Sequence, residues 1–297
     1  MKLYDEIKSH FLLPEAYTDW THYRDTLTHY LIAQTDLISL PLSFHAGMKR
    51  SEMLPTLAII GAGACNDIDL SRIAPHFSKI TLLDSDETAI KKALDTYHLE
   101  HSASICLLPV SLNGITDSDY QQFCDSLQAY IRLHHLSFTP EEFETFTLSQ
   151  LEHIFQKSSQ TAIPLAPASY DYVWCFGVHS QLLAMFSYIY HVFTVNLQHM
   201  FFQDVSISEK AFSERLKKEN NSFIPRLHDA LLASAKKAVF IGCEQKRSGQ
   251  DTPIEGACQA IHDLRTRNLS LTESTILWNF YPAGGISYEM LIQKITL

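Results

Sequence analysis

The chain has 297 residues, 46% of them hydrophobic, so it can bury a large core as one elaborated domain or two small ones, and we expect one. Its 33 acidic and 23 basic residues give a net charge of −10, which disfavours a general nucleic-acid or anionic-membrane partner. The six cysteines form no CxxC pair, so we expect neither a metal site nor a disulfide framework. No run of about 18 apolar residues occurs, and the N-terminus lacks a secretion-signal pattern, so we expect a cytoplasmic protein.

The first 50 residues carry aromatic and aliphatic side chains at helical spacing. They include Tyr4, Ile7, Phe11 and Leu12, then Trp20, Tyr23, Leu27, Tyr30 and Leu31. This pattern predicts two or three amphipathic helices, broken near Pro14 and again near Pro41. We expect residues 1–50 to form a helical cap on a domain that spans residues 51–297.

Residues 56–94 read as strand, glycine turn, helix, strand, acidic tip and helix. Leu57 to Ile60 is a short β-branched apolar run, typical of a parallel strand buried on both faces. The turn at 61–64 has small side chains throughout, which let a ligand approach the backbone closely. Asn66 or Asp67 is expected to cap a helix that runs to about Pro75.

The second strand, 79–83, ends in Asp84. In a right-handed βαβ unit the two strands lie side by side, so this carboxylate is expected beside the glycine turn, where it would accept hydrogen bonds from a ribose diol. The pattern therefore predicts a nucleoside-containing cofactor. The alternative is that the glycines only allow close helix packing and that Asp84 is a solvated loop residue.

The segments IIGAGAC and ITLLDSD resemble motif I and the following acidic motif of class I S-adenosylmethionine-dependent methyltransferases. The resemblance implies a seven-stranded, mostly parallel Rossmann-like α/β sheet with helices on both faces, and S-adenosyl-L-methionine as cofactor. Cofactor contacts are then expected at the glycine turn and the acidic tip, from Gly61, Ala62, Gly63, Asp84, Ser85 and Asp86. The chain departs from the family at Ile59, where an acidic residue often stands, and at Cys65, where the family usually has a third glycine.

After a helix from Glu87 to about Tyr97, residues 104–110 are expected to form the third strand. The resemblance places Ser111, Leu112 and Asn113 beside the adenine ring, although Asn-Gly here is also an ordinary turn signal. Residues 117–160 predict a two-helix insertion, serving as a lid or as a dimer surface. Its second helix starts at Thr139-Pro140-Glu141-Glu142, a capping signature.

Residues 169–176 are expected to form the fourth strand, followed by a helix. The pattern D-x-V-x-x-x-G-V-H-x-x-L resembles the corresponding segment of the same family, which puts Phe176 and Gly177 at the ligand-binding end of the strand. His179 is the candidate general base, with a purely structural role as the alternative. Within 184–234 we expect apolar helix, a break at 220–222 ahead of Pro225, and a new helix over 226–237.

The fifth strand is expected at 238–243, with Glu244 beginning a polar loop. The C-terminal segment WNFYPAGGISYEMLIQKITL predicts a hairpin, which favours a methyltransferase because Rossmann dehydrogenases continue with parallel crossovers. The implied reaction is methyl transfer to a small molecule or a protein side chain, with a homodimer as one possible assembly. The alternatives are an NAD(P)-linked oxidoreductase, disfavoured by Asn66 where its fingerprint needs glycine or alanine, and a non-catalytic interaction module with 184–193 as its contact surface.

Overall fold

The central element of the computed structural model is a seven-stranded sheet of order β3-β2-β1-β4-β5-β7-β6. The structure describes residues 2–35, 54–134, 137–200, 207–249 and 254–297. The strands are β1 (Thr56–Ile60), β2 (Lys79–Asp84), β3 (Ile105–Pro109), β4 (Tyr170–Phe176), β5 (Ala235–Arg247), β6 (Ser270–Tyr281) and β7 (Ile286–Thr296). The first five strands are parallel, and β7 is inserted antiparallel between β5 and β6. The predicted α/β methyltransferase-type fold is therefore confirmed.

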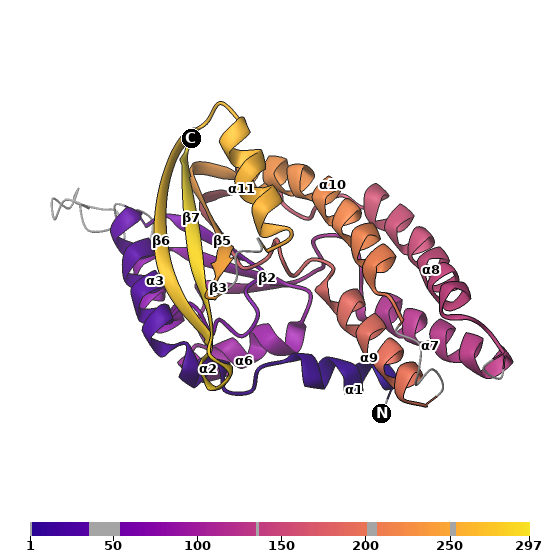
Figure 1. Cartoon of the computed structure of the whole chain (residues 1–297). Coiled ribbons are helices and arrows are strands. Elements are labelled where there is room, and N and C mark those ends of the chain that lie inside the picture. The colour runs from indigo at the N-terminus through magenta and orange to yellow at the C-terminus, as the bar shows by residue number, and fades with distance from the viewer. Residues whose placement is uncertain (1, 36–53, 135–136, 201–206, 250–253) are drawn as a thin grey trace, which may run out of the picture.

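Two helical layers cover the two faces of this sheet (Figure 1). On one face lie α3 (Thr21–Gln34), α5 (Leu70–Ile73), the short η2 (Ala74–His76) and α6 (Glu87–Tyr97), which share a buried core with the side chains of that face. On the other face α10 (Lys210–Ser234) and α11 (Ala257–Thr266) bury their apolar stripes. Each inner strand is apolar on both sides because both faces are covered.

A separate helical module extends to one side of the sheet in Figure 1. It consists of α1 (Leu3–Phe11), α7 (Asp117–His134), α8 (Pro140–Gln160), α9 (Ala184–Met200) and the first half of α10, which together enclose a third core rich in aromatic side chains. The short α2 (Ala16–Asp19) links α1 to the sheet layer. The predicted two-helix insertion is thus confirmed, and Thr139 and Glu142 form the expected capping box at the start of α8.

Several predicted helix limits are wrong. The helix after the glycine turn begins only at Leu70, because Asp69 caps it by accepting hydrogen bonds from the backbone N–H groups of Ser71 and Arg72. The break predicted at 220–222 does not occur, and α10 runs through Pro225 without interruption. Proline removes one backbone donor from a helix, and here the buried stripe on either side of it holds the helix together.

The apolar segment at the start of α9 is core rather than surface. Phe186, Ile189 and Tyr190 are at most 1% exposed, so the side chains proposed for an interaction module contact their own chain. None of the described helices is both long and apolar enough to span a membrane. Pro41, near which a helix break was predicted, lies outside the described residues, as does His135. The division into a cap of residues 1–50 and a domain of residues 51–297 stays a prediction.

Candidate functional site

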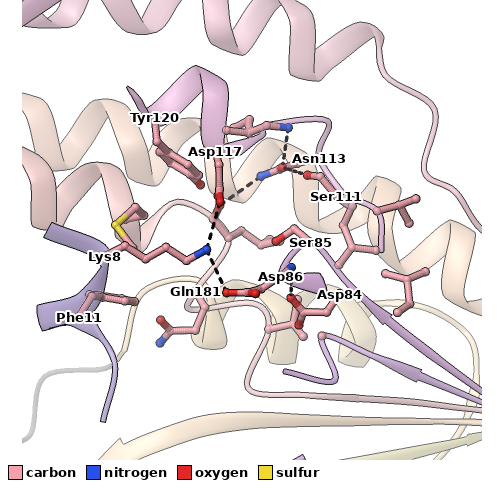
Figure 2. Close-up of a pocket in the computed structure, with 18 of the residues that line it drawn as sticks. Lys8, Phe11, Asp84, Ser85, Asp86, Ser111, Asn113, Asp117, Tyr120 and Gln181 are labelled. Carbon is pink, nitrogen blue, oxygen red and sulfur yellow. Dashed lines mark hydrogen bonds and ion pairs between the residues drawn. The ribbon is translucent and has the colours of Figure 1, made fainter. Parts of the chain in front are cut away.

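A cavity of about 330 Å³ opens at the carboxyl ends of β1 to β4 (Figure 2). The strand order reverses between β1 and β4, and open α/β sheets bind ligands in the crevice at such a switch point. The sheet side of the cavity is formed by the residues that follow the four strands, namely Gly61, Asp84, Ser85, Asp86, Val110, Ser111, Leu112, Asn113, Phe176, Gly177 and Val178. The opposite side comes from the helical module: Tyr4, Lys8, Phe11, Leu12, Asp117, Tyr120, Leu182 and Met185.

Asp84 ties the glycine turn to the tip of β2. Its Oδ2 accepts a hydrogen bond from the backbone N–H of Gly63 at 2.8 Å, and its Oδ1 accepts one from the backbone N–H of Asp86 at 2.8 Å. A carboxylate has about four acceptor positions, so two remain for a ligand. Burial raises the pKa of Asp84 despite these two hydrogen bonds, so it takes up a proton at higher pH than an ordinary aspartate.

The glycine turn is held tightly against β2 and the segment after β4. The backbone N–H groups of Gly61 and Ala62 both donate to the carbonyl of Leu83, at 2.8 and 3.0 Å. Gly61 has a φ of +68°, and a Cβ there would overlap the side chain of Val178. Cys65, in place of the family's third glycine, also takes a positive φ of 50° and is buried. The turn therefore exposes backbone rather than side chain to the cavity at Gly61.

Not all of the turn residues reach the cavity. Ala62 is 5% exposed and packs into the core below the turn, and neither Ala62 nor Gly63 belongs to the cavity lining. Gly63 contributes indirectly, through its hydrogen bond to Asp84. The structure thus brings Gly61, the acidic tip and the residues after β3 and β4 together at one cavity, as predicted. The other two turn residues predicted as cofactor contacts, Ala62 and Gly63, do not line it.

Lys8 reaches from α1 into the acidic part of the cavity, between Asp86 and Asp117 (Figure 2). Its Nζ lies 2.9 Å from Asp86 and 3.2 Å from Asp117, and the hydroxyl of Tyr4 donates to Asp117 at 3.0 Å. Burial acts to lower the pKa of Lys8, but the two carboxylates outweigh it and raise that pKa. Among the described lining residues there are three carboxylates, Asp84 included, against this one ammonium, so the cavity favours a cationic ligand.

The loop after β3 is fixed by Asn113. Its Oδ1 accepts from the Ser111 hydroxyl at 2.8 Å and from the backbone N–H of Ile115 at 3.1 Å, while its Nδ2 donates to the carbonyl of Leu182 at 3.1 Å. Gly114 follows with a φ of +72°, as an Asn-Gly turn requires. The segment therefore forms a turn at Asn113 and Gly114 and also contributes Ser111 and Leu112 to the cavity lining.

His179 lies away from the cavity. Its side chain is fully buried between α10, α11 and β5, with its Nε2 3.0 Å from Nε2 of His228 and its Nδ1 3.6 Å from the sulfur of Cys243. His228 is in turn bound through Nδ1 to Asp263 at 2.6 Å. Burial holds the pKa of both histidines below the ordinary value. The structure therefore gives His179 a place in a buried hydrogen-bond chain and not in the lining of the cavity.

Two residues of the predicted N-terminal cap, Tyr23 and Arg24, do not line the cavity. Tyr23 stacks on Trp278, with ring centroids 5.1 Å apart, and Arg24 donates to the backbone carbonyls of Tyr17 and Asn66. The helix at the cavity is α1, with Tyr4, Lys8 and Phe11 one turn apart on one face. A lysine within that otherwise apolar stripe is the sequence signal for this role.

No protein-family model matches the chain, and no curated protein matches it in sequence. Among solved structures, a SAM-dependent methyltransferase from Aquifex aeolicus is 10% identical over 98% of this chain and 97% of that one, with a TM-score of 0.42. The N-methyltransferase NodS from Bradyrhizobium japonicum WM9, in complex with S-adenosyl-L-homocysteine, is 12% identical over 100% and 98%, with a TM-score of 0.41. Magnesium protoporphyrin IX methyltransferase from Synechocystis PCC 6803, with bound SAH, is 11% identical over 91% and 80%, with a TM-score of 0.41. Such distant matches transfer neither a residue role nor a substrate to this chain.

Proposed function

We propose that the protein transfers a methyl group from S-adenosyl-L-methionine to an acceptor that is a small molecule or a protein side chain. The observation that carries the proposal is the position of Asp84, at the tip of β2 and hydrogen-bonded to the glycine turn, in a cavity at the switch point of the sheet. The strand order, with β7 inserted by a hairpin, supports the same conclusion.

The residues of the cavity fit this cofactor in shape and charge. Asp84 has acceptor positions free for the ribose hydroxyls, and we assign Ser111 and Leu112, which line the cavity after β3, to the adenine ring. Ser85 and Asp86 extend the acidic tip, while Phe176 and Gly177 line the part of the cavity nearest β4. The bound cofactor would supply a methyl group on a sulfonium, and the excess of carboxylates suits that positive charge.

The chain's own contribution to the reaction would be orientation. A sulfonium is already a good leaving group, so holding the nucleophile in line with the methyl group supplies most of what the protein must add. The described residues that line the cavity include no histidine; of its carboxylates, Asp86 and Asp117 are paired with Lys8, and Asp84 is the proposed ribose ligand. We therefore assign no general base, and expect an acceptor whose nucleophile needs little help in losing a proton.

The NAD(P)-linked alternative is disfavoured by two features of the cavity. A dinucleotide places its pyrophosphate on the N-terminus of the helix that follows the glycine turn. Here that helix begins only at Leu70, and the first free backbone N–H groups are taken by Asp69. The surplus of carboxylates would in addition repel the pyrophosphate.

Calorimetric titration with S-adenosylmethionine, S-adenosylhomocysteine and NAD in parallel tests the proposal. We expect micromolar binding of the first two and none of NAD. Formation of S-adenosylhomocysteine in the presence of candidate acceptors then identifies the methylated compound. Binding of NAD alone would refute the proposal. Binding of none of the three compounds would favour the non-catalytic alternative.

A further inference from the structure

Glu244 is a buried carboxylate that lacks a partner for one of its two oxygens. The residue is 4% exposed. Its Oε1 accepts a hydrogen bond from the Ser180 hydroxyl at 3.0 Å, while its Oε2 has no hydrogen-bond partner in the described part of the chain. No lysine, arginine or histidine among the described residues forms an ion pair with it.

The sheet places this carboxylate directly behind the cavity wall. Along β5, Phe240, Gly242 and Glu244 point to the same face. A Cβ at Gly242 would overlap Phe176, so the glycine makes room for a ring that lines the cavity. Beyond it, a Cβ built on Gly177 would come 3.6 Å from Oε1 of Glu244. Glu244 is not itself one of the described lining residues, but it lies next to Gly177, which is one.

Leaving this group unpaired is costly. A buried carboxylate without a counter-charge is strongly unfavourable, and removing the charge by protonation would leave a donor without an acceptor at the same atom. The pKa of Glu244 is raised, with burial as the main cause, and hydrogen bonds from its own backbone N–H and from the Ser180 hydroxyl only partly offset it. The titratable groups that interact electrostatically with Glu244 are the phenols of Tyr23 and Tyr288 and the thiol of Cys243, which supply no positive charge.

We propose that Glu244 binds a protonated amine of a ligand that occupies the cavity next to Gly177. The inference rests on the proposed function, because it assumes that this cavity holds the reacting ligands. Two sources have this chemistry: the α-ammonium of the cofactor's methionine end, and an amine acceptor. Ile59 makes the first source relevant, since the acidic residue that often stands there in the resembled family is missing.

The test compares Glu244→Gln with Glu289→Gln, which makes the same change at an exposed position on the neighbouring strand β7. Calorimetry uses S-adenosylhomocysteine and methylthioadenosine, which share the nucleoside and the thioether but differ in the amino-acid group. If the cofactor's ammonium is the ligand, Glu244→Gln weakens S-adenosylhomocysteine about tenfold or more and leaves methylthioadenosine unchanged. Glu289→Gln changes neither.

If S-adenosylhomocysteine is unaffected, short primary amines are titrated into the protein saturated with it. Binding to the wild type that is lost in Glu244→Gln assigns the carboxylate to the acceptor. The proposal is overturned if the variant matches the wild type for both nucleosides and for the amines. A wild type that binds no S-adenosylhomocysteine refutes the proposed function instead, and amine titration of the free protein then decides the role of Glu244 separately.

Thermal melting separates a binding role from a structural one. A carboxylate kept for a ligand destabilises the empty protein, so Glu244→Gln is expected to melt at a higher temperature than the wild type when no ligand is present. A purely structural carboxylate gives the opposite shift. A variant that melts lower and loses both nucleosides equally has lost the local fold, and this result would count against the proposal.

Discussion

The sharpest prediction concerns Asp84→Asn. The change keeps the size of the side chain but leaves one oxygen for two backbone donors, the N–H groups of Gly63 and Asp86, both now 2.8 Å from a carboxylate oxygen. One of these donors would then face an amide NH₂ group. Hydrogen bonds to a charged group contribute about 1.5–3 kcal/mol each.

The ligand loses the same kind of interaction. If the ribose hydroxyls donate to Asp84, replacing the carboxylate by an amide removes a charge-assisted acceptor, and the dissociation constant for S-adenosylhomocysteine is expected to rise roughly 10- to 100-fold. The assay is calorimetric titration of the wild type, Asp84→Asn and the matched control Asp95→Asn, which lies exposed on α6. Affinity unchanged from the wild type, in a variant with an intact fold, would refute the ribose assignment.

The pH dependence provides a second readout of the same carboxylate. Burial raises the pKa of Asp84, so the free protein begins to take up a proton there at higher pH than an ordinary aspartate. Affinity for S-adenosylhomocysteine is expected to fall as the pH drops through this pKa, since the protonated form is a poorer acceptor. Asp84→Asn is expected to lack this dependence, and the same acid slope in the variant would assign it to another group.

Three further predictions address the walls of the cavity and the buried histidines. Lys8→Met removes the ion pairs with Asp86 and Asp117, each worth about 1 kcal/mol or less, so amide hydrogen exchange should become faster in α1. Unchanged protection would mean that apolar packing alone holds this helix. Gly61→Ala places a residue with a Cβ in the left-handed region, at a cost of about 1–2 kcal/mol, and makes that Cβ overlap Val178, so the melting temperature should fall. Adding Val178→Ala removes the overlap but not the backbone strain, so it should recover only part of the lost melting temperature. Because burial lowers the pKa of His179 and His228, the unfolded chain binds protons that the folded chain rejects, and the free energy of unfolding should fall as the pH drops below the ordinary value of 6.5. The His179→Asn variant should have a lower free energy of unfolding than the wild type at neutral pH, but this free energy should fall less between neutral pH and mild acid. Urea unfolding at several pH values measures both. A fall with pH as steep as that of the wild type would contradict the prediction.

The part of the site that could be read from the sequence is the part built from neighbours along the chain. The strand before Gly61, the strand that ends in Asp84 and the helix that follows it were predicted because each has a local pattern of apolar spacing, glycine or caps. The βαβ handedness then places the acidic tip beside the turn without further information. The Thr139 capping box likewise depends on four consecutive residues.

The errors occur where distant segments decide the outcome. Proline predicts a helix break, yet Pro225 lies inside α10 because the residues on both sides of it bury one continuous apolar face. Asn220, taken as a helix breaker, donates its side-chain N–H to the carbonyl of His179 at 3.0 Å. Local propensity is a weak prior, and burial against the sheet outweighs it.

The sequence by itself determined the first βαβ unit, the ribose-binding candidate Asp84 and the presence of a helical insertion, because these depend on spacing within a few tens of residues. Only the tertiary structure decided that α1 rather than 21–34 covers the cavity, that His179 faces His228 instead of a substrate, and that Glu244 lies behind Gly177. Each of these depends on which segments pack together across a separation of more than 40 residues. That pairing is set by the burial of whole faces, and local patterns, such as Lys8 in the apolar stripe of α1, do not specify which segments meet.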